Sequence, residues 1–588
     1  MTFIGLLSVI SACFVPGAIA VLILPLRQRP FASLLTVLFF SLVYTHLKVV
    51  LLTALHLYCS TTVYALFAAE AALLGYLLMR RDPKPEFEER VTPDGLVFAL
   101  TAVIVLAWIF ATANLGRKSL FQGWAFWDAI VSWNRWALLW AGGKFPSQTN
   151  GYPQMIPSLW SYSYIFVGTR QIELFANQIN NAFILAVPLI AMDLALRRRI
   201  AMLGGLLAGL WFFAYSPLAM WTFQGSADGP LAATCLAVFY ACHLFYNEKN
   251  SSAKQAQYFI AAGLAAVAAI VKQQGMLFAL LVPPLLALDL PKGKRLRSLI
   301  WAYVLALVIT GPWYGYYLAQ FATGAEQTNV GKLDHLTSVL AKTDSVWKRA
   351  MRGVGMWSTM FGPHVVTLVF PAVVAAGLAL ARKWRAMILI FVIGYFFIWS
   401  YAFSYDIRNS VMAAALVAFV CGLAAEGIAG LVPRRESRRE QRSRWLFRFT
   451  TRQVILVMAA GSLIFAGLVG YAIPDTRLTA LQHAANTDKG HRDVNLLLYK
   501  AMDLGLMKGF VKTNYEVMCY DPYFKDVHII FTFFQTEGEV KSIVADRRFK
   551  TVVIWKRGQF MPNTVRDLLG GGFKPMLGNE VVEVYCRD

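Results

Sequence analysis

Long apolar runs alternate with short, mostly basic connectors from the start of the chain to about residue 474. Because roughly twenty apolar residues cross a bilayer as a helix, this pattern predicts an α-helical polytopic membrane protein with about 13–14 transmembrane helices. Several runs are shorter than a full crossing, so the pattern defines their ends poorly. The predicted spans are 3–26, 31–55, 60–79, 95–114, 170–196, 200–218, 229–246, 257–271, 276–290, 298–318, 364–381, 386–404, 409–431 and 453–473.

The composition agrees with a membrane protein. Of the 588 residues, 57% are hydrophobic and 15% are charged, and the mean hydropathy is +0.52. A soluble chain could not bury so much apolar surface. The net charge of +22 would suggest nucleic acid in a soluble protein. Here most Lys and Arg residues lie in the connectors, where they control topology, so we expect no nucleic-acid partner.

The basic connectors all fall on one predicted face of the membrane, which the positive-inside rule identifies as cytoplasmic. Counting spans from these connectors places the N-terminus, the long loops 115–169 and 319–363, and the C-terminal tail on the outer side. The first loop is rich in Trp, Tyr and Pro, and we expect interfacial helices in it. The basic connectors are at 80–84, 197–199, 292–297, 382–385 and 434–452.

After the predicted transmembrane domain (1–474), the composition becomes that of a soluble domain. Its apolar segments predict buried strands, and a short helical pattern ends at three consecutive glycines. We therefore predict a small extracytoplasmic α/β domain over residues 475–588. The predicted strands are 527–534, 551–555 and 581–585, and the predicted helix is 563–569.

Two of the seven cysteines, Cys519 and Cys586, lie in this C-terminal region. On the outer side they would share an oxidising compartment and could form a disulfide. Two unpaired thiols on neighbouring strands are the alternative. The chain has no CxxC motif and no Cys/His spacing typical of a zinc site.

The first outer loop carries the densest polar and aromatic cluster, which runs from Gly123 to Ala129 and includes Asp128. A carboxylate partly shielded from water at the end of a span could act as a general base for an acceptor hydroxyl. The alternative is an interfacial aspartate that caps a helix beginning at Ala129. Trp133 and Arg135 follow within the same loop.

Two further ionisable residues lie between spans on the same outer side. Asp228 is in the segment 225–230, where glycine and proline also favour a simple turn with a helix cap. Lys272 begins the polar interruption 272–275 between two short spans. Such an interruption is tolerated where it is buried in protein or lines a cavity, so Lys272 could hold a phosphate. A loop lysine or a snorkelling side chain is the alternative.

Arg408 lies in the tight outer turn 405–409. Its planar guanidinium could bind a phosphate through two parallel hydrogen bonds. The alternative is a surface pair with Asp406, which would contribute little. None of these four sites is specific alone; their joint position on one side of the membrane is the stronger indication.

In the first outer loop, Trp127-Asp128-Ala129, the basic Arg135 seven positions after the aspartate, and Gly151-Tyr152-Pro153 resemble the corresponding loop of the GT-C superfamily. These are integral-membrane glycosyltransferases that use polyprenyl-phosphate sugars. The closest resemblance is to the bacterial branch related to protein mannosyltransferases and to the lipid A aminoarabinose transferase.

Three later segments resemble motifs of the same branch, in the same order, so that the resemblance covers roughly residues 95–475. They are 227–232, 272–275 and 405–409. Two positions depart from the pattern. Ala129 stands where many relatives have a second acid, which leaves open whether Asp128 acts alone or with Asp228. Asn409 stands where the branch has an aromatic residue.

The resemblance implies an inverting single displacement on the outer face of a bacterial cytoplasmic membrane, without a bound cofactor. Asp128 would accept the proton of the acceptor hydroxyl, with Asp228 as a second catalytic candidate. The sugar donor would be a polyprenyl phosphate, and the acceptor a glycan, lipid or protein of the cell envelope. Fixed cations would stabilise the departing phosphate. Arg135, Lys272 and Arg408 are the candidates for the phosphate, while Trp127, Trp133 and Tyr152 could contact sugar or prenyl chain, or serve as interfacial anchors.

Two other functions fit parts of the sequence. A glycan polymerase or ligase would use a lipid diphosphate and rely on arginines and a histidine, for which His335 and His364 are available. A transporter or flippase of a lipid-linked or anionic solute could use the interruption at 272–275. No obvious internal repeat supports transport.

Overall fold

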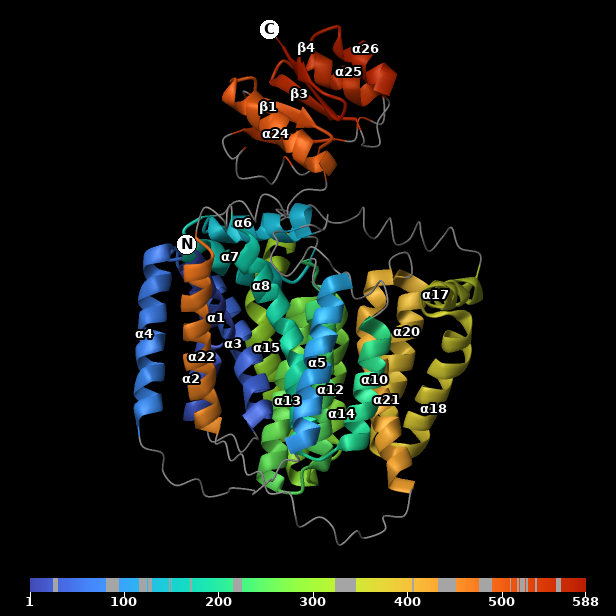
Figure 1. Cartoon of the computed structure of the whole chain (residues 1–588). Coiled ribbons are helices and arrows are strands. Elements are labelled where there is room, and N and C mark those ends of the chain that lie inside the picture. The colour runs from blue at the N-terminus through green and yellow to red at the C-terminus, as the bar shows by residue number, and fades with distance from the viewer. Residues whose placement is uncertain are drawn as a thin grey trace.

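The computed structural model comprises a helical bundle and a smaller C-terminal unit built on a β-sheet (Figure 1). Ten of its helices are long and apolar enough to cross a membrane, counted over the described residues, and an eleventh span is added if one bent pair is included. The α-helical polytopic fold with a small C-terminal sheet is therefore confirmed. The described residues are 1–24, 30–80, 95–115, 124, 129–146, 149, 151–169, 172–214, 225–322, 345–403, 407–431, 451–474, 489–507, 509–515, 518, 524, 527–532, 534, 537–556 and 562–587.

The helices coincide closely with the predicted spans. The first apolar run divides at Phe14 into α1 and α2, and α15 extends well beyond the predicted 298–318. Its first turns contain the basic residues predicted as a connector, since lysine and arginine side chains can extend from a helix end to water. The bundle helices are α1 (Thr2–Cys13), α2 (Val15–Ile23), α3 (Pro30–Ala54), α4 (Ser60–Met79), α5 (Gly95–Leu115), α8 (Leu174–Ala182), α9 (Ala186–Leu196), α10 (Ile200–Ala214), α12 (Asp228–Asn247), α13 (Ser251–Val271), α14 (Met276–Ala287), α15 (Lys292–Ala322), α18 (Phe370–Leu380), α21 (Val411–Leu431) and α22 (Thr451–Ala472).

The segment predicted as span 386–404 is built differently from the rest. It is a succession of short α- and π-helical turns, α19 (Arg385–Met387), η6 (Ile388–Gly394), α20 (Tyr395–Ile398) and η7 (Trp399–Phe403). Before it, α17 (Val346–Phe361) is bent by 119° from the helical stretch that continues into α18. Part of the second outer loop is thus a helix that does not run along the bundle.

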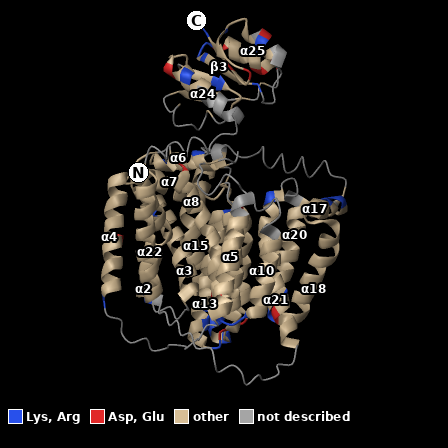
Figure 2. Cartoon of the chain, in the orientation of Figure 1, with Lys and Arg blue, Asp and Glu red and all other residues tan. Residues whose placement is uncertain are grey.

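The two ends of the bundle differ in charge. Figure 2 shows a group of Lys and Arg at the end of the bundle far from α6 (Arg135–Ala141), beneath α13, besides others at α6 and α17. At that far end, Arg197 pairs with Asp193 at the end of α9, and Arg199 pairs with Glu426 of α21. The opposite end carries α6 and α7 (Met155–Val167), which belong to the first outer loop (Figure 1).

The helix α7 is held by a row of buried polar contacts from α1, α3 and the turn that follows α3. Its own polar residues Ser158, Ser161, Tyr162 and Ser163 are all fully buried. Because buried polar groups are costly without partners, this row fixes the position of α7. The contacts are His46 Nδ1 with Ser158 Oγ (2.7 Å), Tyr58 with Ser161 (3.0 Å), Ser11 with Tyr162 (2.7 Å) and Ser8 with Ser163 (3.3 Å).

A buried ion pair stands beside this row. Lys48 Nζ of α3 lies 2.9 Å from Glu70 Oε1 of α4, and both side chains are at most 10% exposed. The same ammonium lies 4.9 Å from the centre of the Tyr162 ring of α7. One buried cation thereby joins three helices, and its charge is balanced only by Glu70 among the described residues.

The C-terminal sheet has the strand order β2-β1-β3-β5-β4, in which β1, β2 and β3 are parallel while β4 and β5 pair in antiparallel fashion. Separate hydrophobic cores cover its two faces, one containing α24 (Lys489–Asp503) and the other α25 (Glu537–Ala545) with α26 (Pro562–Leu569). The strands are β1 (Phe510–Thr513), β2 (His528–Phe531), β3 (Phe549–Trp555), β4 (Lys574–Gly578) and β5 (Val582–Cys586).

Of the predicted elements, three strands and one helix correspond to β2, β3, β5 and α26. The strands β1 and β4 were not predicted, because β1 is a short strand that buries only alternate residues and β4 is an edge strand that contains Pro575. The domain boundary at residues 474 and 475 stays a prediction. So does the disulfide, because Cys519 lies outside the described residues; Cys586 Sγ is within 3.4 Å of the Leu506 carbonyl oxygen.

We expect Glu70→Met to destabilise the protein by about 3 kcal/mol, because it leaves the Lys48 ammonium buried without its countercharge. The double variant Lys48→Met/Glu70→Met should recover most of this loss. Glu426→Met removes half of a more exposed pair and should change stability by less than about 1 kcal/mol. Unfolding in detergent, followed by tryptophan fluorescence, would measure all three. A wild-type midpoint for Glu70→Met alone would contradict the prediction.

In the C-terminal sheet, partial burial raises the pKa of Glu583, but hydrogen bonds from Lys556, Tyr585 and Arg566 outweigh it and hold the pKa below its usual value. Because its pKa is lower in the folded state, the Glu583 carboxylate stabilises the fold at pH values above its unfolded-state pKa of about 4.3. This stabilisation is lost as the pH falls through the folded-state pKa. We therefore expect the hydrogen-exchange protection of β3–β5 in the full chain, measured relative to the intrinsic exchange rate at each pH, to decrease below about pH 4.3. Glu583→Gln should flatten this dependence, whereas Glu537→Gln in an exposed pair should not.

Candidate active site

Three helix ends meet around one buried lysine. Lys272 follows the last residue of α13, and its ammonium is ion-paired with Asp228 in the first turn of α12. It also donates a hydrogen bond to Asn409 Oδ1 (3.1 Å), in the short helical turn η8 (Ile407–Ser410) that precedes α21. The side chains of Lys272 and Asp228 are only 9% and 7% exposed. Lys272 is therefore neither a solvated loop lysine nor a snorkelling one.

The chain reverses directly after Lys272, and Gly275 makes this reversal possible. A Cβ atom at Gly275 would lie 1.9 Å from the carbonyl oxygen of Ala268, so any other residue would collide with the preceding helix. The backbone N–H of Gly275 donates to the Lys272 carbonyl (2.9 Å). The following helix α14 packs against α13, so the polar interruption is a turn between two helices rather than a break in one.

The two glutamines of this turn connect the lysine to other elements. Gln274 Nε2 donates to Asn409 Oδ1 (3.2 Å), the same oxygen that accepts from Lys272. Gln273 Nε2 donates to the carbonyl oxygen of Gly151 (2.9 Å), in the first outer loop. The outer loop and the lysine turn are thus joined by a direct hydrogen bond.

Asn409 is the functional candidate that sequence reasoning missed. It was noted only as a departure from an aromatic position, yet its side chain accepts from Lys272 and Gln274 while its carbonyl accepts from the Tyr395 hydroxyl (2.6 Å). The available signal was the replacement of an aromatic by an amide in an outer turn. Such a change indicates a polar contact in place of packing.

The residues flanking Asp128 are held tightly on both sides, although Trp127 and Asp128 themselves lie outside the described residues. Trp124 is buried and stacks on Trp160 with ring centres 3.7 Å apart. Its backbone N–H donates to Glu173 Oε2 (2.9 Å). On the other side, Ala129 is fully buried and begins the π-helical turn η1 (Ala129–Asn134). Such turns occur often at functional sites.

Glu173 ties the end of η1 to Trp124. Its second carboxylate oxygen accepts from Asn134 Nδ2 (3.1 Å), and Asn134 Oδ1 accepts from the Tyr164 hydroxyl (2.6 Å). The Trp124 indole N–H closes the network by donating to Tyr164 (3.1 Å). The carboxylate therefore positions the segment that contains Asp128 from both of its ends.

Gly225 brings this segment against the turn that leads to Asp228. Its φ is +82°, a backbone region that favours glycine, and a Cβ there would lie 2.4 Å from the Trp124 ring and 3.0 Å from the Ala129 Cβ. Trp124 and Ala129, which flank residues 125–128, therefore both pack against Gly225. Gly225 lies only three positions before Asp228 in the sequence.

The other predicted site residues are distributed around this centre. Arg135 is half-buried at the start of α6, and Arg408 is half-buried next to Asn409. Trp133 is buried with its ring 5.7 Å from that of Tyr152, so these two residues pack against each other. Ala227 is the helix cap of α12, and the Asp228 carboxylate turns instead to Lys272. Within the described residues, no group of three or more His, Cys, Asp or Glu could hold a metal ion.

The fold resembles that of a known membrane protein. ArnT from Cupriavidus metallidurans bound to undecaprenyl phosphate superposes with a TM-score of 0.51 at 15% sequence identity, over 84% of this chain and 98% of ArnT. Its structure in the apo state gives a TM-score of 0.48 at 14% identity, over 84% and 97% of the two chains. No protein-family profile matches the sequence, and a search of curated proteins gave no significant match. The GT-C fold implied by the sequence resemblance is confirmed.

We expect Gly225→Ala to displace Trp124 and to destabilise the protein by more than about 1 kcal/mol, since the new methyl would meet a ring in a positive-φ turn. The near-ultraviolet circular dichroism of the Trp124–Trp160 stack should change as well. Gly204→Ala in α10, where the added methyl would meet no atom within 4 Å, is the matched control: it should leave the spectrum unchanged and should not destabilise the protein, because alanine favours a helix more than glycine does. An unaltered spectrum of Gly225→Ala would contradict the proposed close packing.

Proposed function

We propose that this protein is a membrane glycosyltransferase that moves a sugar from a polyprenyl-phosphate donor to a hydroxyl of a cell-envelope acceptor. The observation that carries the proposal is the buried Lys272 ammonium, whose neighbour Gln273 donates a hydrogen bond to Gly151 of the first outer loop. The likeness to ArnT, whose structure contains undecaprenyl phosphate, supports the same donor class.

Lys272 has the properties needed to hold a departing lipid phosphate. An ammonium has three N–H donors, and Asp228 and Asn409 accept from it. Among the described residues these are its two acceptors, which leaves one donor for a phosphate oxygen, and the low exposure strengthens such an interaction because water screens it little. In the proposed mechanism Arg135 and Arg408 add further charge around the phosphate, and Arg408 adjoins Asn409 in η8.

Asp128 is the proposed general base. The acceptor oxygen attacks the anomeric carbon and loses its proton to Asp128, while the bond from that carbon to the phosphate oxygen breaks and its electron pair stays on the phosphate. Because the Asp228 carboxylate is paired with Lys272, we assign Asp228 to orienting the lysine. Trp127 remains a candidate for sugar contact, whereas the buried position of Trp133 favours support of the loop.

The active site is proposed to face the outside of the cytoplasmic membrane. A group of Lys and Arg lies at the end of the bundle opposite α6 (Figure 2), as the positive-inside rule expects of a cytoplasmic end. The same assignment puts the C-terminal sheet, which lies beyond the α6 end in Figure 1, on the outer side.

The two other functions receive less support. The transporter hypothesis rested on the polar interruption at 272–275 between two short spans, and these residues form a tight turn between two packed helices. For the polymerase or ligase, His335 lies outside the described residues, and His364 is exposed beside the bend between α17 and α18. No described contact links His364 to Lys272.

To test the proposal, purified protein would be given a panel of radiolabelled polyprenyl-phosphate sugars with membrane-extracted acceptors. We expect turnover or donor hydrolysis with one sugar, reduced about 10²- to 10⁴-fold by Asp128→Asn, the range for loss of a general base. Lys272→Gln should weaken donor binding as well as turnover, because it removes the phosphate contact.

Lys383→Gln, an exposed lysine at the opposite end of the bundle, is the control and should leave both quantities unchanged. Consumption of a lipid-diphosphate donor in place of the monophosphate, with activity retained in Asp128→Asn, would refute the proposal in favour of the polymerase or ligase.

A further inference from the structure

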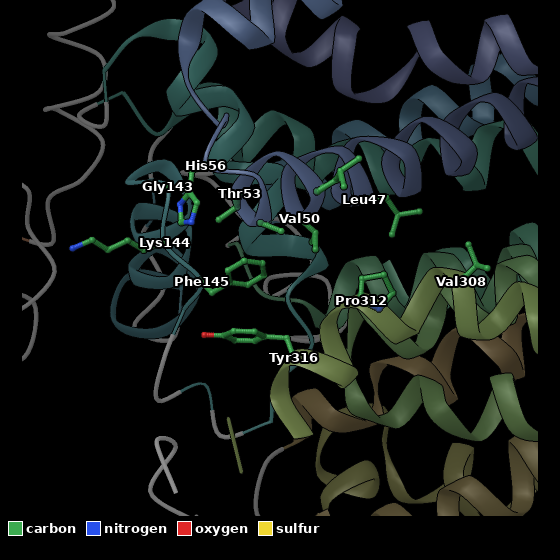
Figure 3. Close-up of a pocket in the computed structure, with 12 residues that line it drawn as sticks. Leu47, Val50, Thr53, His56, Gly143, Lys144, Phe145, Val308, Pro312 and Tyr316 are labelled. Carbon is green, nitrogen blue, oxygen red and sulfur yellow. The ribbon is translucent and has the colours of Figure 1, made fainter. Parts of the chain in front are cut away.

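A groove of about 950 Å³ lies between α3, α15 and the segment that follows α6 (Figure 3). Five of its twelve lining residues belong to α3, and the others come from the turn after α3, from residues 143–145 and from α15. None of them belongs to the cluster of Lys272, Asp228 and Asn409, so the groove lies outside that site. Leu51 and Val308 on its rim are 59% and 56% exposed, so it opens sideways toward the membrane.

The groove has an apolar end and a polar end. Figure 3 shows Leu47 and Val308 at one end and His56 and Lys144 at the other. From Val308 to Tyr316 the helix α15 rises about 12 Å, which is close to the depth of one hydrocarbon leaflet, half of about 30 Å. The polar end lies toward α6, where headgroups of the outer leaflet would be.

The polar end is structurally defined on both sides. His56 has φ of +56° and terminates α3 with the bonds of a Schellman motif, Leu57 N–H to the Leu52 carbonyl (2.8 Å) and His56 N–H to the Thr53 carbonyl (3.1 Å). Opposite, Phe145 stacks on Tyr316 with ring centres 4.4 Å apart, next to Lys144. Histidine is one of the few non-glycine residues found repeatedly in this backbone region, and here it places an imidazole at the polar end of the groove.

We infer that this groove binds an anionic glycerophospholipid, with its acyl chains against α3 and α15 and its phosphate between Lys144 and His56. At about 30 Å³ for each methylene, the share of one water molecule in the liquid, the groove accommodates about thirty carbons. This is the size of two acyl chains. The apolar end, the lateral opening and the cationic end together match that lipid in length, access and charge.

The test is native mass spectrometry of the full chain in detergent with phosphatidylglycerol, diacylglycerol, glycerol phosphate and a polyprenyl phosphate. We expect phosphatidylglycerol to bind at least tenfold more tightly than diacylglycerol, which lacks the phosphate, and than glycerol phosphate, which lacks the acyl chains. Val308→Trp should fill the groove and weaken this binding at least tenfold, as should His56→Gly with Lys144→Ala. Glycine suits the backbone at position 56, so the fold should persist.

Leu307→Trp is the matched control, because Leu307 is 68% exposed on the same helix and does not line the groove. Equal phosphatidylglycerol binding by Val308→Trp and wild type would overturn the inference. The inference would also be overturned if the groove variants lost binding of the polyprenyl phosphate alone, or if glycerol phosphate bound as tightly as phosphatidylglycerol. Each readout is lipid binding, so its failure is independent of the proposed transferase activity.

Discussion

The ion pair between Lys272 and Asp228 determines how the centre of the bundle can be arranged. An ionised side chain among membrane helices is expensive unless an opposite charge and hydrogen-bond acceptors lie within reach. The pair therefore requires α12 to begin where α13 ends, and Asn409 requires η8 to reach the same place. Gly275 permits this meeting because the chain can reverse against Ala268 without a side chain between them.

A second set of contacts brings the first outer loop to this centre. Glu173 accepts hydrogen bonds from Trp124 and Asn134, and Gly225 lets Trp124 and Ala129 pack directly against the turn before Asp228. The catalytic loop of the proposed enzyme is thus positioned by one carboxylate and one glycine. Neither Glu173 nor Gly225 belongs to the motifs by which the chain resembles a family. Their contacts depend on the particular side chains that this sequence places beside them.

The sequence predicted the helices well because membrane spans must satisfy their backbone hydrogen bonds internally and therefore leave long apolar runs. It also predicted β3 and β5, whose residues are mostly buried, but not the exposed edge strand β4. In the site, hydrophobicity and motifs indicated Asp228 and Lys272 as separate candidates. Their pairing, and the role of Asn409, arise from contacts across 44 and 137 positions that no local pattern encodes.

The polar face of α7 has a consequence for biosynthesis. Among the side chains that this thirteen-residue helix buries are three serines and Tyr162, which would be costly to leave unpartnered in a membrane. Their partners, in α1, α3 and the turn after α3, leave the ribosome earlier, and N-terminal segments are the first to fold. When α7 leaves the ribosome, the helices that supply its hydrogen-bond partners are therefore already in place. The outer loop can then assemble on them in the order of synthesis.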